Sequence, residues 1–343
     1  MTLKRTLPAI SWLALIALAI LAIVAPEYLL DWPAAFAAAP TFVGNTFDGD
    51  FLQRAVTRAV TGNQTVDGGH VYVRDGVRSS LNMQRLKVEN IIQDRQETPT
   101  SQGAIELSKR RLTTNDYMIY IEFNPRNFEG HYFEGMLSGE TVFSELPPEI
   151  QGQFTDRSLR QNDHDLDKAI WQGDTAGTAP FDKFDGLITL LAADPGTIDV
   201  TSPVTLTASN IIDKLTDSLD LVPEAIMQEA NLKCFMSPKT HRLYGDALRN
   251  LTNKSIAPED GPPAIFEGKR LVPLVGFPND TLLWAVSSAD LDSNLWMGAA
   301  SVQDAQAIQI DKVSAASELF FFKMLLKVGT QIAFPEETVL YKV

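Results

Sequence analysis

Two stretches of alternating apolar and polar residues, separated by a long polar stretch, most restrict what this chain can fold into. Residues 70–92 alternate through HVYVRDGV and, after a turn, through LNMQRLKVENIIQD. Residues 117–125, YMIYIEFNP, alternate in the same way, and a period of two residues is typical of a β-strand. Residues 94–116 between them are polar. This order predicts a long hairpin with a polar tip, which protrudes instead of forming a compact core.

The rest of the chain mixes helical and strand patterns. Pro147 and Pro148 suit a first helical turn, because the missing N–H of proline costs nothing there, so we expect a long helix to about Trp171. Further helices are predicted over residues 48–62, 210–221 and 239–250, and strands over 198–206, 232–238, 308–313 and 318–334. A polar loop is expected over 252–264. No period of 20–50 residues recurs, so a solenoid is excluded.

The N-terminus carries an uncharged segment. Residues 9–25, AISWLALIALAILAIVA, follow Lys4 and Arg5, and as a helix they would be about 25 Å long, the short limit for a membrane span. Ala-Phe-Ala at 35–37 or Ala-Ala-Ala at 37–39 could serve as a cleavage site, so a signal peptide is one interpretation. A hydrophobic arm that packs on a neighbouring subunit, or a processed leader, are the others.

The charge of the chain is acidic and unevenly spread. A net charge of −14 argues against nucleic acid as the main partner, because binding phosphate needs a basic surface. Residues 48–116 are nearly balanced, whereas residues 117–343 hold 17 basic and 32 acidic side chains. The two regions could attract one another between copies of the chain.

Residues with the spacing of a catalytic or metal site were not found. The single cysteine, Cys234, excludes an intrachain disulfide, and we expect it to be a small buried hydrophobe. The four histidines, His70, His131, His164 and His241, lie far apart in the sequence. No phosphate-binding glycine loop, nucleophile elbow or dinucleotide fingerprint is present. We therefore predict no catalytic, cofactor-binding or metal-ligating residue, and no enzyme activity.

Two charged runs have simpler interpretations than a ligand site. Asp163, Asp165 and Asp167 resemble the start of a calcium loop, but Lys168 stands where that loop needs glycine, so an exposed acidic helical face is expected. The run Lys109-Arg110-Arg111 fits a solvated loop, or a contact with nucleic acid or with an acidic neighbouring subunit.

Five segments in order resemble a known family. They are YIEFNPRNFEGHY at 120–132, DHDLDKAIWQGDTAG with FDKFDGLITLL at 163–191, SNIIDKLTDSLDLVPEAI at 209–226, LKCFMSPKTHRLYGDALRN at 232–250 and FEGKRLVPLVGFPNDTLLWA at 266–285. Together they resemble the major capsid proteins of tailed phages with the Hong Kong 97-type (HK97-like) fold, and are similar to those of phages of Bacteroidetes-like hosts. The resemblance covers residues of about 42–343 and leaves the hydrophobic leader outside it.

The resemblance implies an α+β fold with an N-terminal arm, an extended-loop hairpin, a peripheral domain with a long spine helix, and an axial domain. The expected divisions are a leader or arm over 1–40, an N-terminal arm over 41–69, the hairpin over 70–130, the peripheral domain with its spine helix over 131–180, the axial domain over 181–300 and return strands over 301–343. Phe181 and Phe184 are expected to wedge into the joint between the spine helix and the axial domain, and Gly186 to allow a sharp turn there. Lys109, Arg110 and Arg111 are the expected contact between subunits.

The resemblance also implies a function. It predicts a structural subunit that assembles into hexamers and pentamers of an icosahedral shell around a phage genome, with no cofactor. Scaffold, portal and cement proteins are possible partners, and genome DNA is expected to bind only weakly and non-specifically. The location implied is the virion, after assembly in the host cytoplasm. The alternative is an exported or membrane-anchored bacterial protein, a binding module or a hydrolase, which would use residues 1–40 as its signal or anchor.

Overall fold

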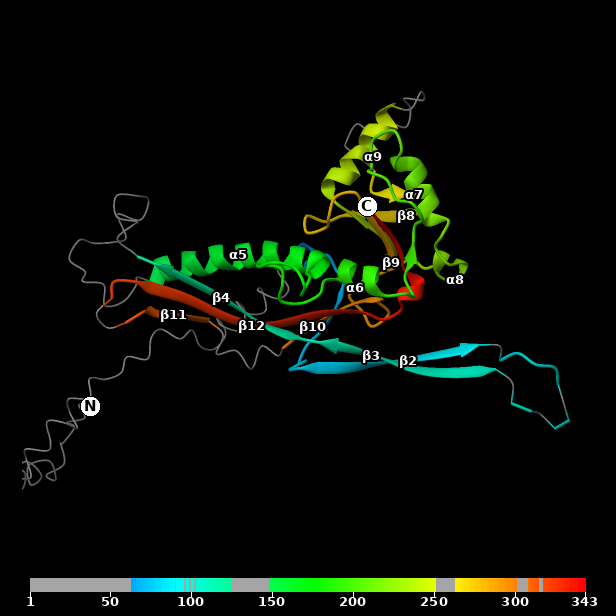
Figure 1. The fold of residues 1–343 in the computed structure, drawn as a ribbon, viewed down its shortest axis with the longest axis horizontal. Coiled ribbons are helices and arrows are strands. Elements are labelled where there is room, and N and C mark those ends of the chain that lie inside the picture. Colours follow the sequence, from blue (N-terminus) through cyan, green and yellow to red (C-terminus); the bar gives the residue numbers. More distant parts are fainter. Residues whose placement is uncertain are drawn as a thin grey trace, which may run out of the picture. The chain divides into compact units, whose positions relative to one another are not determined.

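The computed structural model describes residues 63–89, 91–95, 97–98, 100–101, 103–124, 148–250, 263–300, 308–314 and 317–343 (Figure 1). The hydrophobic leader, the helix predicted over 48–62 and most of the loop predicted over 252–264 lie outside the described residues.

The longest strand, β12 (Phe320–Ile332), organises a five-stranded sheet. Its first half pairs with β11 (Ile308–Lys312) on one side and with β4 (Asn115–Phe123) on the other. Its second half pairs with β10 (Leu295–Ala299), which in turn pairs with β1 (Tyr72–Arg74). The strands predicted over 308–313 and 318–334 are therefore confirmed.

A six-stranded sheet has the order β5-β13-β9-β6-β8-β7. Its strands are β5 (Ile198–Asp199), β13 (Val339–Lys342), β9 (Thr281–Val286), β6 (Leu232–Met236), β8 (Lys269–Pro273) and β7 (Ile265–Phe266). Only the first two residues of the strand predicted over 198–206 are in a strand. The two sheets do not divide at residue 300, because β10, before it, belongs to the five-stranded sheet and β13, after it, to the six-stranded one. The boundary predicted there between the axial domain and the return strands stays a prediction.

Two buried clusters lie on the two faces of the six-stranded sheet. Alternation along β6 sends Phe235 to one cluster and Cys234 and Met236 to the other, so every residue of this strand is buried. The first cluster also holds residues of the five-stranded sheet and of helices α5 (Pro148–Gln172) and α6 (Leu187–Ala193). The second includes residues of α7 (Ile211–Leu219) and α9 (Pro238–Asn250).

Helix α5 confirms the long helix that was predicted to start at the proline pair. In Figure 1 it runs along β4 and β12, which form part of the five-stranded sheet. The helices predicted over 210–221 and 239–250 are confirmed as α7 and α9. The described residues also hold three short helical turns: α4 (Gln64–Asp67), α8 (Glu224–Met227) and the 3-10 turn η5 (Pro335–Glu337).

The hairpin is present, but its second strand differs from the prediction. Strand β2 (Ser80–Glu89) pairs along its whole length with β3 (Ala104–Thr113), which lies within the stretch predicted as a polar tip. The strand recognised at 117–125 is β4, which pairs with β12 instead of with the hairpin. The basic run hid the strand character of β3, although Ile105 and Leu107 alternate with polar residues there.

Candidate functional site: the hairpin and its root

Alternation along the hairpin divides its side chains between two faces. In the register of β2 and β3, Leu81 pairs with Leu112 and Met83 with Arg110, so these four share one face. We call it the body face, because Met83 and Leu112 are buried against the rest of the subunit. The opposite face, termed the free face, is made of Asn82, Gln84, Leu86, Val88, Ile105, Leu107, Lys109 and Arg111.

The root of the hairpin packs directly on strands β10 and β12. Leu112 is fully buried there. A Cβ on Gly329 would lie 1.9 Å from the carbonyl oxygen of Thr113, and a Cβ on Gly298 would lie 3.0 Å from a methyl carbon of Leu112. The backbones approach too closely for a larger residue at Gly329, which explains a glycine in the middle of the long strand. The root is therefore held by backbone contact as well as by side chains.

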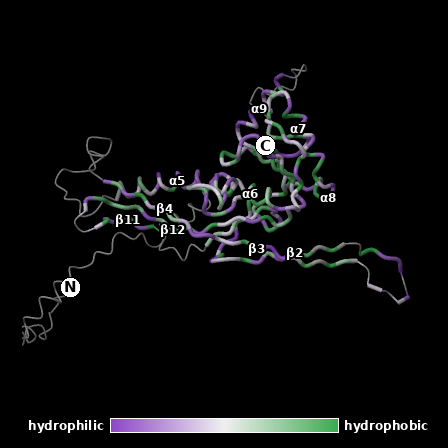
Figure 2. Tube along the Cα trace, in the orientation of Figure 1, coloured by the Kyte–Doolittle hydropathy of each residue, from purple (hydrophilic) through white to green (hydrophobic). Residues whose placement is uncertain are grey.

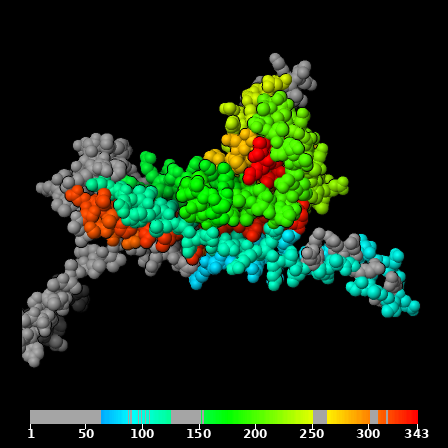
Figure 3. Space-filling model, viewed as in Figure 1, coloured from blue at the N-terminus to red at the C-terminus, as the bar shows by residue number. Residues whose placement is uncertain are grey.

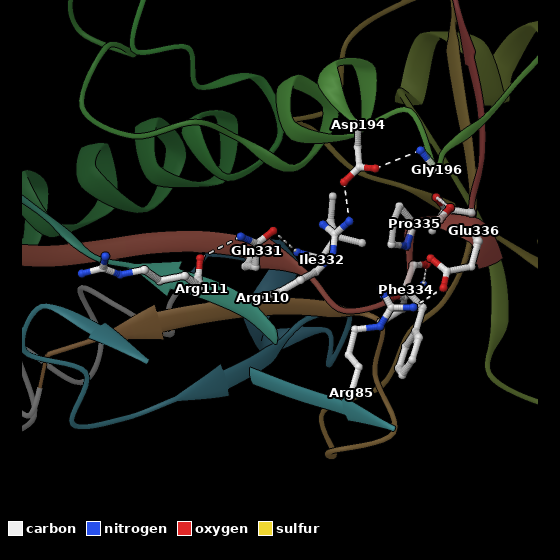
Figure 4. A network of polar contacts seen from close by, with 12 residues as sticks. Arg85, Arg110, Arg111, Asp194, Gly196, Gln331, Ile332, Phe334, Pro335 and Glu336 are labelled. Atoms are coloured by element: carbon white, nitrogen blue, oxygen red, sulfur yellow. Dashed lines mark hydrogen bonds and ion pairs between the residues drawn. The ribbon is translucent and has the colours of Figure 1, made fainter. Parts of the chain in front are cut away.

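Arg85 fixes the hairpin to the turn before the last strand (Figure 4). Its guanidinium pairs with the carboxylate of Glu336 and lies 4.5 Å from the centroid of the Phe334 ring. Phe334 is in turn tied to Asn294, whose side-chain amide donates to the Phe334 carbonyl at 2.6 Å. Stacking of a guanidinium on an aromatic ring strengthens as water is excluded. This contact thus adds to the ion pair at the hairpin root.

Arg110 makes a second link, to the end of α6. It pairs with Asp194, and the Asp194 carboxylate also accepts a hydrogen bond from the N–H of Gly196 at 2.9 Å (Figure 4). Burial alone would raise the pKa of Asp194, but the hydrogen bonds from Arg110 and from Gly196 hold that pKa below its usual value. The Asp194 carboxylate is thus kept charged for this contact. Nearby, the Gln331 amide donates to the carbonyl of Arg111 at 2.8 Å.

Farther from the root, the free face becomes apolar and exposed. Leu86 pairs with Leu107 and Val88 with Ile105, and their exposed fractions are 64%, 60%, 45% and 74%. Ile92, near the tip, is 93% exposed. Figure 2 shows the apolar character of these strands, and in Figure 3 the hairpin (cyan) forms part of the visible surface. An isolated hairpin is only marginally stable in water, and a contiguous exposed apolar patch marks an interaction surface.

The structure splits the basic run between the two faces. The solvated-loop interpretation is wrong, because Lys109, Arg110 and Arg111 all lie in β3. Arg110 is on the body face and is bound to Asp194 of its own subunit. Lys109 and Arg111 are exposed on the free face, next to the apolar pairs. Their contact with a neighbouring subunit stays a prediction.

The residues predicted to form a joint lie between α5 and α6. Phe184 is buried in the first cluster, and half-buried Phe181 has the Lys168 ammonium 4.5 Å from its ring centroid. Gly186 has a φ of −77°, so the turn itself does not require glycine. A Cβ there would instead lie 2.6 Å from the backbone nitrogen of Gly173 at the end of α5. The predicted reason for this glycine is therefore wrong, since close approach of two backbones requires it.

The segment from α5 to α6 is also closed by polar contacts. The Asp185 carboxylate accepts hydrogen bonds from the N–H of Thr175 at 2.8 Å and from its hydroxyl at 2.7 Å. The Asp185 carbonyl accepts from the hydroxyl of Thr330 in β12 at 2.5 Å. Helix α6 packs on α5 and on β12. Its function as a joint between two lobes stays a prediction.

The acidic run 163–167 contains a buried structural carboxylate. The exposed face predicted for it is wrong at Asp167, which is buried. One Asp167 oxygen accepts hydrogen bonds from the N–H and the hydroxyl of Thr65, and the other accepts from the N–H of Gly276 at 2.9 Å. The Trp171 indole donates to the same Thr65 hydroxyl at 2.8 Å. Asp167 thus ties α5 to two segments about a hundred residues away in the chain.

Chemically reactive groups are few in the part of the chain that the structure describes. No three metal-ligating side chains gather there. Burial raises the pKa of the Cys234 thiol, which favours the protonated form. No helix among the described residues combines the length and the apolar character that a membrane crossing requires. The arrangement of the site fits contact with another surface better than it fits catalysis.

Comparison with known proteins gives no match to a family model or to a curated protein. Solved structures do match. The capsid of a native GTA particle is 14% identical with a TM-score of 0.53, over 90% of this chain and 97% of that chain. The capsid of Myoviridae phage XM1 is 12% identical with a TM-score of 0.52, over 80% and 90% of the two chains. Microbacterium phage Oxtober96 gives 12% identity and a TM-score of 0.51, over 82% and 90%.

The chain has the Hong Kong 97-type capsid fold. The predicted α+β fold class is thereby confirmed. The match to the GTA capsid covers 97% of that chain. At these low identities the likeness concerns the fold, and the function has to be argued from the surfaces that the fold presents.

Proposed function

We propose that this chain is a major capsid protein, a structural subunit that self-assembles into the icosahedral shell of a tailed phage. The capsid fold supports this proposal, because the similar structures come from capsids. The observation that carries it is the free face of the hairpin. A subunit that acts alone gains nothing from four exposed apolar side chains on a two-stranded ribbon, whereas a subunit in a shell buries them on a neighbour.

A second exposed apolar surface supports the same proposal. Met118 and Leu325 pair across β4 and β12 and are 54% and 49% exposed, and Tyr120 beside them is 45% exposed. This patch lies on the five-stranded sheet, apart from the hairpin. A closed shell places heterologous contacts on several edges of each subunit, so more than one apolar patch is expected. The role proposed is structural and not enzymatic.

The proposal extends to partners and location. We infer hexamers and pentamers of this chain within the shell, assembled in the host cytoplasm and found in the virion. Portal, scaffold and cement proteins would be further partners. Genome DNA would bind weakly and non-specifically, because the net charge of −14 repels phosphate.

Expression and electron microscopy test the function. The full-length chain and a chain that begins at residue 41 would be purified and imaged. Shells or ring-shaped capsomers are expected from at least one of them. A monodisperse monomer from both, with the full-length protein processed and recovered from the periplasm, would contradict the proposal and favour the exported alternative.

A matched pair of variants tests the hairpin itself. Replacing Leu86 and Leu107 by glutamate should abolish assembly, because the free face could then be buried only with unpaired charges. Leu291, equally exposed at 65% but in the turn after β9, serves as the control, and Leu291→Glu should still assemble. Assembly by the double variant at wild-type protein concentration would count against the hairpin as the contact.

A further inference from the structure

Three basic side chains gather on one face of the six-stranded sheet. Lys233 of β6 is only 9% exposed, and the parallel register places it beside Arg270 of β8. His70, 6% exposed, packs edge-on against Phe235, which lies two residues after Lys233 on the same face of β6. Like charges on neighbouring strands destabilise a sheet, so this arrangement needs an explanation.

No negative charge compensates this cluster within the described residues. Neither Lys233 nor Arg270 forms an ion pair or a hydrogen bond with any residue in those segments. Burial lowers the pKa of Lys233, and the charge of Arg270 lowers it further. Burial, together with the charges of Lys233 and Arg270, lowers the pKa of His70 to about 4. Lys233 is 9% exposed, and proteins normally pair so weakly exposed a charge or bind a counter-ion to it.

Two buried polar atoms beside the cluster also lack a partner. They are Nδ1 of His70 and the hydroxyl oxygen of Ser287. Ser287 continues β9, since its N–H donates to the Asn231 carbonyl at 2.9 Å, and it lies two residues beyond Ala285, the partner of Lys233 in the register. By alternation, the Ser287 side chain is on the same face as Lys233. Buried polar atoms are nearly always hydrogen-bonded, so these two atoms indicate that a binding partner is missing.

We propose that Lys233, Arg270, His70 and Ser287 form a binding site for one oxyanion. An ammonium, a guanidinium, an imidazole N–H and a hydroxyl are all donors, and phosphate or carboxylate oxygens are acceptors that would satisfy them together. Two sources share this chemistry: free phosphate, or a carboxylate of a second copy of this chain. Exposed Arg270 marks the opening of the site toward solvent. Only a carboxylate of a second copy depends on the proposed shell; free phosphate does not.

Reductive methylation of the full-length chain distinguishes these sources, with mass spectrometry of each lysine as the readout. A bound anion favours the protonated amine, and each pKa unit that it restores slows methylation about tenfold. Lys233 would be followed in free chain in chloride, in free chain with inorganic phosphate, and in assembled particles in chloride. Exposed Lys239 serves as the internal control and should react equally in all three conditions.

Protection of Lys233 by phosphate in free chain would identify a free oxyanion as the ligand. Protection only in particles would identify a neighbour's carboxylate. Equal methylation of Lys233 in all three conditions would overturn the site. The phosphate arm needs no assembly, so a chain that forms no shell still tests the inference.

A variant gives a second readout. Lys233→Met removes the uncompensated charge and keeps the length of the side chain, so its Tm in chloride should equal or exceed that of the wild type. Where phosphate is the ligand, it should raise the Tm of the wild type but not that of Lys233→Met. An equal rise in both proteins would assign the phosphate to another site and overturn the proposal.

Discussion

Asp167 ties the described N-terminal segment to helix α5. Its carboxylate accepts three hydrogen bonds, two from Thr65 and one from the N–H of Gly276. Gly276 can approach only because it lacks a side chain, since a Cβ there would lie 2.4 Å from the Asp167 carbonyl oxygen. Hydrogen bonds to a charged acceptor contribute about 1.5–3 kcal/mol each to stability. Removing the charge therefore affects three segments at once.

Asp167→Asn should reduce the free energy of unfolding by about 3 kcal/mol, because an amide retains one acceptor oxygen and turns its NH2 toward a former donor. Urea denaturation measures this loss. Asp165→Asn is the matched control, since Asp165 lies on the same helix, is partly exposed and accepts from Gln161 one turn away. The control should change stability by less than about 0.5 kcal/mol. Equal losses in the two variants would mean that Asp167 is not the link between the segments.

His70 makes stability depend on pH. Its pKa in the folded chain is about 4, below the ordinary value of 6.5, so the unfolded chain binds a proton more readily between these values. The stability that His70 contributes is present above pH 6.5 and is lost as the pH falls toward 4. In phosphate-free buffer we expect a loss of about 2 kcal/mol between pH 7 and pH 5. Urea denaturation at both pH values should show this loss in the wild type and not in His70→Gln. The same slope in both proteins would assign the dependence to other groups.

At the scale of elements, the spacing of residues within a segment predicted those helices and strands that such spacing determines. The proline pair predicted α5, and strand-like sequence predicted β11 and β12. Strand β3 was missed because its evidence is pairing with β2, in a register that joins residues up to about thirty positions apart. A run of three basic residues is typical of a loop, and only the alternation of a strand places Arg110 on the opposite face from Lys109 and Arg111. Asp167 was misplaced for the same reason, because its partners lie about a hundred residues away.

The segment between α5 and α6 yields a prediction about elements. Phe184 is 4% exposed and is packed in the core that α5 and α6 share, whereas Phe181 is partly exposed. Phe184→Ala should cost about 3–4 kcal/mol of unfolding free energy and weaken assembly, because it leaves a cavity where the two helices meet. Phe181→Ala, the matched control, should cost about 1 kcal/mol, from lost area and from the contact with Lys168. Equal costs would show that the joint is not centred on Phe184.

At the scale of the whole molecule, the hairpin separates two tasks by strand alternation. Its body face holds it to its own subunit through Arg85, Arg110 and Leu112. Its free face presents Lys109 and Arg111 beside an apolar patch. A projecting element needs both a face that anchors it and a face that docks, because an unanchored ribbon would lose too much conformational entropy on docking. In the proposed shell, stability of the subunit and stability of the assembly would therefore depend on alternate residues of the same two strands, β2 and β3.

This separation gives a prediction about charge. Lys109→Glu with Arg111→Glu should leave the Tm of the subunit nearly unchanged, because both side chains are exposed. The same double variant should raise the protein concentration needed for assembly at least about tenfold, because residues 117–343, with 17 basic and 32 acidic side chains, would repel it. Light scattering at several salt concentrations measures the effect, which should shrink as salt screens the charges. The pair Lys239→Glu and Lys342→Glu makes the same change in net charge at exposed positions away from the hairpin, and should assemble normally. If both double variants lose assembly equally, net charge and not the free face of the hairpin limits assembly.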